Sequence, residues 1–239
     1  MPAPFDTMFA PPEPTAERPL LGLTVLVVED SRFASEAMRL LCLRSGARIR
    51  RADSLTSARK HLRVYRPAVV IVDLGLPDGS GTELIAELTN AVPRVGAVLA
   101  MSGDTGVEAA ARAAGADAFI AKPITGLAAF QSIILEAFPA HARPKGLSVV
   151  SDAVVTPDPI ALQDDLVHVA DILTTQTSDD VLDYIAQFLA GIARSVEDEE
   201  MAEAAVSLAS RRQNGLPQGA DVARVSGLVQ ARIAPGRVL

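Results

Sequence analysis

Five side chains that can carry chemistry each follow a short apolar run in the N-terminal half of the chain. They are Glu29 and Asp30 after the first run, Asp73 after the third, Ser102 after the fourth and Lys122 after the fifth. Three crowded carboxylates repel one another unless a cation lies among them, and a site of oxygen ligands suits Mg²⁺. The metal ion and the lysine ammonium would together neutralise a phosphoryl group. Asp73 could then act as a nucleophile and form an acyl phosphate.

Short apolar runs alternate with longer amphipathic stretches between residues 22 and 138. We expect strands at 23–28, 47–51, 68–72, 96–101 and 118–121, and helices at 32–46, 54–65, 81–91, 105–115 and 125–138. Unbroken apolar strands that alternate with helices indicate a parallel sheet covered on both faces. Right-handed crossovers then give a five-stranded, doubly wound α/β sandwich. Ligands of such sheets bind outside the carboxyl ends of the strands, where the five side chains lie.

Together these motifs resemble the receiver domain of two-component response regulators. The resemblance rests on "ED" at 29–30, "DLGLPDGSG" at 73–81, the serine after the fourth strand and "KP" at 122–123. It covers residues 22–140, and every motif falls in the expected order. It implies a flavodoxin-like sheet with the strand order 2-1-3-4-5.

The resemblance also implies a phosphorylation site and a metal site. Asp73 matches the phospho-accepting aspartate. The implied Mg²⁺ ligands are Glu29, which usually acts through metal-bound water, Asp30, Asp73 and the backbone carbonyl of Gly75. Since glycine has no side chain, Gly75 is expected to leave the space beside Asp73 open to water.

Three further residues match positions that respond to the phosphoryl group. Ser102 matches the hydroxyl that turns toward it, and Lys122 matches the cation that pairs with it. Phe119 matches the aromatic switch, although ordinary packing is an equally good interpretation of this residue. Serine and phenylalanine replace the more common threonine and tyrosine, so Phe119 has no hydroxyl.

Composition divides the chain into four predicted parts. Residues 1–20, with six prolines, are expected to be a disordered extension, and residues 21–140 the receiver domain. Residues 141–158 are expected to be a linker, whose part from 148 onward either continues the linker or docks loosely. Residues 159–239 are expected to be an all-α output or dimerisation domain. The single cysteine, Cys42, excludes an internal disulfide.

The C-terminal part shows apolar stripes at helical spacing. We expect helices at 159–175, 178–196, 199–210 and 220–233. Residues 159–210 are predicted to form a helical hairpin that pairs with a second copy in a dimeric bundle. The alternative is that this hairpin packs on the last strand and helix of the receiver.

Charge and motifs limit the function classes. Residues 147–239 hold 6 Lys+Arg against 14 Asp+Glu, so this part is a poor partner for phosphate backbones. We expect a cytoplasmic response regulator that receives a phosphoryl group from a sensor histidine kinase or a histidine phosphotransfer protein. Its output is expected to be protein interaction or homodimerisation, without nucleic acid, membrane or enzymatic activity beyond self-dephosphorylation. The alternative is a transcription factor that binds DNA through its C-terminal helices.

Overall fold

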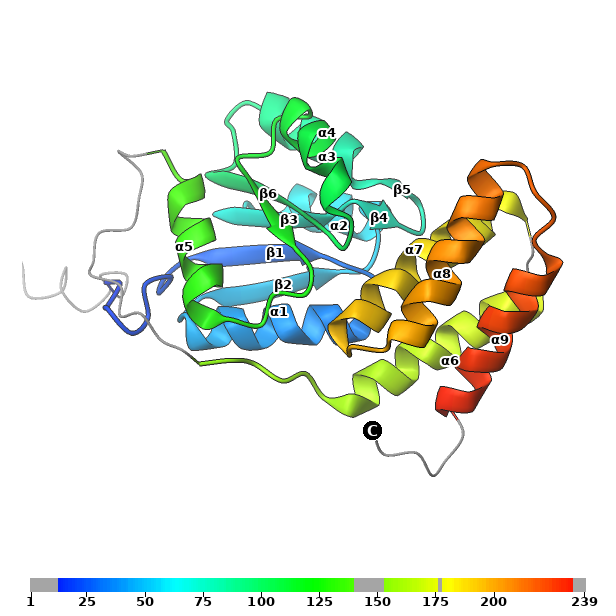
Figure 1. Ribbon diagram of the computed structural model, residues 1–239. Coiled ribbons are helices and arrows are strands. Elements are labelled where there is room, and N and C mark those ends of the chain that lie inside the picture. Colours follow the sequence, from blue (N-terminus) through cyan, green and yellow to red (C-terminus); the bar gives the residue numbers. More distant parts are fainter. Residues whose placement is uncertain (1–12, 140–152, 176–177, 234–239) are drawn as a thin grey trace, which may run out of the picture.

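A computed structural model describes residues 13–139, 153–175 and 178–233. Its N-terminal half is a parallel sheet between layers of helices, and a group of helices stands beside one end of that sheet (Figure 1). The strands, in the sheet order β2-β1-β3-β6-β7, are β2 (Arg48–Ala52), β1 (Thr24–Val28), β3 (Val69–Asp73), β6 (Ala97–Ser102) and β7 (Ala118–Ala121). All four pairings are parallel, so the predicted fold and strand order are confirmed.

Two layers of helices cover the sheet because its central strands are apolar on both faces. Every residue of β3 and β6 is buried. One face packs against α1 (Arg32–Arg44) and α5 (Leu127–Ala137). The other packs against α2 (Leu55–Val64), α3 (Gly81–Asn90) and α4 (Glu108–Ala113), the last of which follows a 3₁₀ turn, Thr105–Val107. A short hairpin that the sequence did not predict, β4 (Gly75–Leu76) with β5 (Gly79–Ser80), follows β3.

The ordered α/β unit extends beyond the predicted boundaries at both ends. Leu20 is 0% exposed and its amide donates to the carbonyl oxygen of Ser45 at 3.0 Å, so this residue belongs to the core rather than to a disordered extension. Val155 is 1% exposed and its amide donates to Thr125 O at 3.0 Å. Residues 153–155 therefore dock beside the start of α5. Residues 1–12 of the predicted extension and residues 141–152 of the predicted linker lie outside the described residues.

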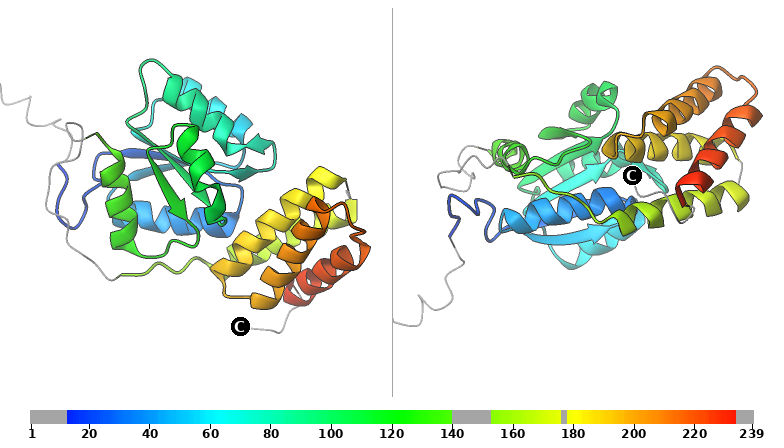
Figure 2. Two further views of the ribbon diagram at one scale, coloured as in Figure 1. Left: turned by 45° about the horizontal axis from the view of Figure 1, so that its top comes forward. Right: turned by 60° about the horizontal axis from the view of Figure 1, so that its bottom comes forward.

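Four helices form what we call the helical unit, residues 159–233. They are α6 (Pro159–Thr175), α7 (Asp179–Ser195), α8 (Glu199–Gln213) and α9 (Gly219–Ile233). They enclose a hydrophobic core of their own, separate from the two cores of the sheet. Figure 2 shows from two further directions that the helical unit lies at one end of the α/β unit, where α6 packs on α1. Among the described residues, no helix is both long enough and apolar enough to cross a membrane.

The predicted hairpin between 159–175 and 178–196 is not the main pairing. α7 packs chiefly on α8, whereas α6 packs on α9 and on α1. The reason is that α8 presents the small buried side chains of Ala204 and Ala205 to the wide apolar stripe of α7, which lets the two helices approach closely.

We expect Leu189→Ala in α7 to lower the free energy of unfolding of the helical unit by about 2–5 kcal/mol, because Leu189 is 0% exposed and its removal leaves a cavity. Val206→Ala in α8, where the side chain is 54% exposed, should change it by less than about 0.5 kcal/mol. Urea unfolding followed by circular dichroism measures both. Equal shifts of the two midpoints would contradict the packing described.

Candidate functional site

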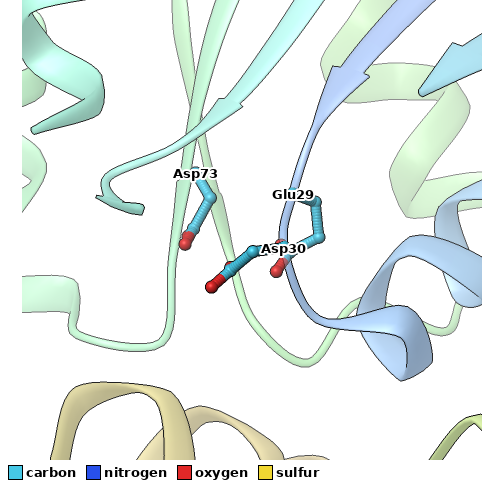
Figure 3. A group of neighbouring side chains, drawn as sticks. All are labelled: Glu29, Asp30 and Asp73. Carbon is cyan, nitrogen blue, oxygen red and sulfur yellow. The ribbon is translucent and has the colours of Figure 1, made fainter. Parts of the chain in front are cut away.

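The carboxyl ends of the strands bring the predicted site residues together. Asp73 ends β3, Glu29 and Asp30 follow β1, and Lys122 follows β7. In Figure 3 the carboxyl groups of Glu29, Asp30 and Asp73 lie close to one another beyond the ends of their strands. One oxygen of each carboxylate lies within 4.8 Å of the others. The charged residues expected at this edge from the sequence therefore form one cluster.

Lys122 joins two of these carboxylates. Its Nζ lies 2.9 Å from Asp73 Oδ1 and 2.5 Å from Glu29 Oε2, and the three side chains are 12% exposed or less. Burial raises the pKa of Glu29 well above its usual value, since Lys122 only partly offsets the cost of desolvation. Burial alone would lower the pKa of Lys122, but the charges of Asp73 and Glu29 outweigh it and raise that pKa. The lysine therefore stays charged between its two partners.

The third carboxylate, Asp30, is held by the helical unit. Tyr184 of α7 donates a hydrogen bond from Oη to Asp30 Oδ2 at 2.6 Å. The second oxygen, Asp30 Oδ1, is buried and has no hydrogen-bond partner among the described residues. Burial raises the pKa of Asp30 to about 6, and the Tyr184 hydrogen bond opposes that rise. A buried oxygen without a partner is costly, so Asp30 Oδ1 is an available ligand atom beside the other carboxylates.

The loop after Asp73 keeps its backbone close to the site. A β-carbon on Gly81 would collide with the carbonyl oxygen of Asp73, so the chain can return this closely only with glycine there. Asp78 ties the same loop to α2 by accepting from the amides of Leu55 at 2.8 Å and Thr56 at 2.9 Å. The "DLGLPDGSG" motif thus forms a compact loop that holds Gly75 beside Asp73.

The remaining predicted residues lie nearby without a contact that tests their roles. Ser102 ends β6 and is 1% exposed, and its Oγ accepts from the amide of Asp104 at 3.1 Å. Phe119 in β7 is partly buried against the core cluster that contains α2, α3 and α4. The phosphoryl contact of Ser102 and the switch role of Phe119 stay predictions.

Helix α7 covers the cluster, which the sequence did not predict. A cavity of about 30 Å³ lies between the strand ends and α7. Its lining includes Asp73 and Lys122 from the α/β unit and Gln187 and Ser195 from α7. Figure 1 shows α7 running past the end of the sheet toward β4. The site is therefore built from both parts of the chain.

Asp165 of α6 fastens the helical unit to the first turn of α1. Its carboxylate accepts from Ser31 Oγ at 2.8 Å, from the amide of Arg32 at 2.8 Å and from the amide of Phe33 at 3.0 Å. These amides have no partner inside α1, and a helix N-terminus favours a negative charge. Burial nevertheless raises the pKa of Asp165, which is 3% exposed. The alternative in which the C-terminal helices pack on the last strand and helix is therefore corrected, because they pack on the strand ends and α1.

Residues 25–133 match the family model of the response regulator receiver domain. Residues 25–133 form a receiver domain. These boundaries lie inside the predicted 21–140. The cluster of Glu29, Asp30 and Asp73 described above belongs to this domain.

Curated proteins and solved structures match part of this chain. The KDP operon transcriptional regulatory protein KdpE of Escherichia coli is 34% identical over 135 residues, which are 55% of this chain and 59% of KdpE. The transcriptional regulatory protein CitB of Klebsiella pneumoniae is 39% identical over 66 residues, which are 27% of this chain and 28% of CitB. The chain thus spans less than two thirds of the length of these curated relatives. A solved receiver domain (CheY-like) from Methylobacillus flagellatus is 26% identical, with a TM-score of 0.43, over 47% of this chain and 95% of that one.

Three residues that approach the receiver from the helical unit were missed by the sequence analysis. Asp165, Tyr184 and Gln187 lie on helices whose apolar stripes alone were used to predict packing. The sequence feature that could have indicated two of these contacts is the spacing of Tyr184 and Gln187. They lie three residues apart and therefore share one side of α7.

We expect Asp165→Ala to accelerate hydrogen exchange at the amides of Arg32 and Phe33 by roughly tenfold or more, because both lose a charged acceptor. Asp164→Ala is the matched control, since the only ion pair that this neighbour makes among the described residues is with the guanidinium of Arg32, and its side chain is 45% exposed. It should change exchange at these amides little. Equal effects of the two variants would show that Asp165 does not fasten α6 to α1.

Proposed function

We propose that the whole chain is a phosphorylation-controlled response regulator that accepts a phosphoryl group on Asp73. The proposed donor is a sensor histidine kinase or a histidine phosphotransfer protein. The observation that supports this most is the ion pair between Lys122 Nζ and Asp73 Oδ1 within a cluster of buried carboxylates. A carboxylate oxygen of Asp73 would attack phosphorus while the bond from phosphorus to the donor breaks, and Lys122 would then pair with the transferred group.

The proposed metal is Mg²⁺, and the residues present fit it. Glu29, Asp30 and Asp73 supply oxygen ligands, as does the backbone carbonyl of Gly75, and Asp30 Oδ1 lacks a hydrogen bond that a metal would have to displace. When bound, Mg²⁺ would neutralise part of the charge of the phosphoryl oxygens. This chain's own residues would orient the nucleophile and keep the site largely enclosed.

The proposed output is protein interaction through the helical unit. Four of its five described arginines are engaged in ion pairs: Arg211 with Asp221, Arg212 with Asp179 and Asp183, Arg224 with Glu203, and Arg232 with Asp198 and Glu200. Self-association stays a prediction, although Leu189 and Ile192, whose stripe motivated it, are buried within one chain. Light scattering on the full chain measures it.

DNA binding is the second candidate, because the relatives named above are transcriptional regulators. Few described cations of the helical unit are free to contact phosphates, which favours protein interaction. A mobility-shift assay at low salt, with and without phosphorylation, separates the two. A retarded complex that salt weakens steeply would favour DNA binding.

We expect the protein to be phosphorylated by acetyl phosphate with Mg²⁺ and Asp73→Asn to be unlabelled, because the amide is not a comparable nucleophile. The matched control is Asp53→Asn, since Asp53 is exposed and follows β2 at the same edge of the sheet. It should be labelled like the unaltered protein. Radiolabel retained on Asp73→Asn at full level would refute the assignment.

A further inference from the structure

Gln187 lies in the space that glycine leaves open beside the proposed phosphorylation site. A β-carbon on Gly75, two residues after Asp73, would collide with Gln187 Nε2 and lie 3.0 Å from Gln187 Oε1. The carboxamide of α7 therefore packs directly on the backbone of the Asp73 loop. Any residue with a side chain at position 75 would push it away.

The surroundings of this carboxamide allow it to hold a water molecule. Gln187, Asp73 and Lys122 line the same cavity of about 30 Å³. A water molecule needs about 10–15 Å³ of such space and two to four polar partners. Among the described residues, no hydrogen bond engages the Gln187 carboxamide, which offers both an acceptor oxygen and two N–H donors.

We propose that Gln187 is a water-positioning residue by which the helical unit accelerates hydrolysis of the phosphoryl group on Asp73. This inference rests on the proposed phosphorylation of Asp73. Glutamine carboxamides orient the attacking water in phosphoryl-transfer sites of GTPases, where positioning supplies most of the catalysis.

The reaction is a simple hydrolysis. The water oxygen forms a bond to phosphorus while the bond between phosphorus and the Asp73 oxygen breaks. The products are the Asp73 carboxylate and inorganic phosphate, and the proton lost by the water passes to phosphate or to solvent. Gln187 itself is unchanged, since it only fixes the direction from which the water approaches.

Two contacts keep α7 in position for this role. The hydroxyl of Tyr184, one turn before Gln187, donates a hydrogen bond to Asp30. The carboxylate of Asp165 in α6 accepts hydrogen bonds from the start of α1. The helical unit then sets the lifetime of the phosphoryl group while it is docked. A partner that draws α7 away from the receiver would lengthen that lifetime.

The test measures loss of phosphate from the full chain. Protein labelled with radioactive acetyl phosphate is desalted, and release of label is followed in Mg²⁺ buffer. Gln187→Ala should slow release on the order of tenfold to a hundredfold. Gln213→Ala, an exposed glutamine at the end of α8, is the matched control and should release label at the unaltered rate.

A double-mutant cycle separates water positioning from a structural effect. Gly75→Ala displaces the carboxamide and should slow release as Gln187→Ala does, while adding it to Gln187→Ala should slow release no further. Hydrogen exchange at the amides of Arg32 and Phe33 should stay slow in Gln187→Ala, because Asp165 still docks α6.

The outcomes distinguish this inference from the proposed function. If labelled Gln187→Ala protein loses phosphate at the unaltered rate or faster, the proposed role of Gln187 is wrong, and the proposed phosphorylation of Asp73 is unaffected. Full additivity of the two substitutions also overturns it. Absence of label on the unaltered protein overturns both proposals.

Discussion

The site depends on one buried ammonium between two buried carboxylates. Lys122 follows β7, Asp73 ends β3 and Glu29 follows β1, so the ion pairs connect three strands of the sheet. Removing one partner of such a group leaves an uncompensated buried charge, which costs several kcal/mol. The strand register and the charge cluster therefore constrain each other. The parallel sheet brings the charges to one edge, and the charges penalise any arrangement that separates them.

The acidic helical unit can pack beside the acidic site because the polar side chains at their contact are hydrogen-bonded. Asp165 does not face the carboxylates as a bare charge, because it accepts three hydrogen bonds at the positive end of α1. Tyr184 brings a hydroxyl donor, rather than another anion, to Asp30. Acidic side chains elsewhere in the unit pair with its own arginines, as Asp183 does with Arg212. Each of these contacts near the cluster thus pairs a donor of one part with an acceptor of the other.

Docking and the chemistry proposed for Asp73 share atoms, so they must be coupled. Asp30 is at once an acceptor for Tyr184 and a proposed metal ligand, and the space beside Gly75 is filled by Gln187. Any ligand or modification that alters these groups changes the free energy of docking, and docking changes its affinity for them by the same factor. If Asp73 is phosphorylated as proposed, docking of the helical unit and the state of the receiver are therefore thermodynamically linked.

The strands, helices and parallel sheet of the α/β unit could be predicted from sequence, because apolar runs, turns and the charges at the strand ends are local patterns repeated along the chain. The strand order was implied only by the resemblance to receiver domains. Glu29, Asp30, Asp73 and Lys122 could be placed together for the same reason, since a parallel sheet sends all its carboxyl ends to one edge. Apolar spacing likewise determined that the C-terminal part is helical. Tertiary structure alone decided that α7 pairs with α8, that Leu20 and Val155 complete the receiver core, and that Asp165, Tyr184 and Gln187 reach the site. The contacts of Asp165, Tyr184 and Gln187 with the receiver join residues over 100 positions apart, and these polar side chains show no periodicity that indicates a partner.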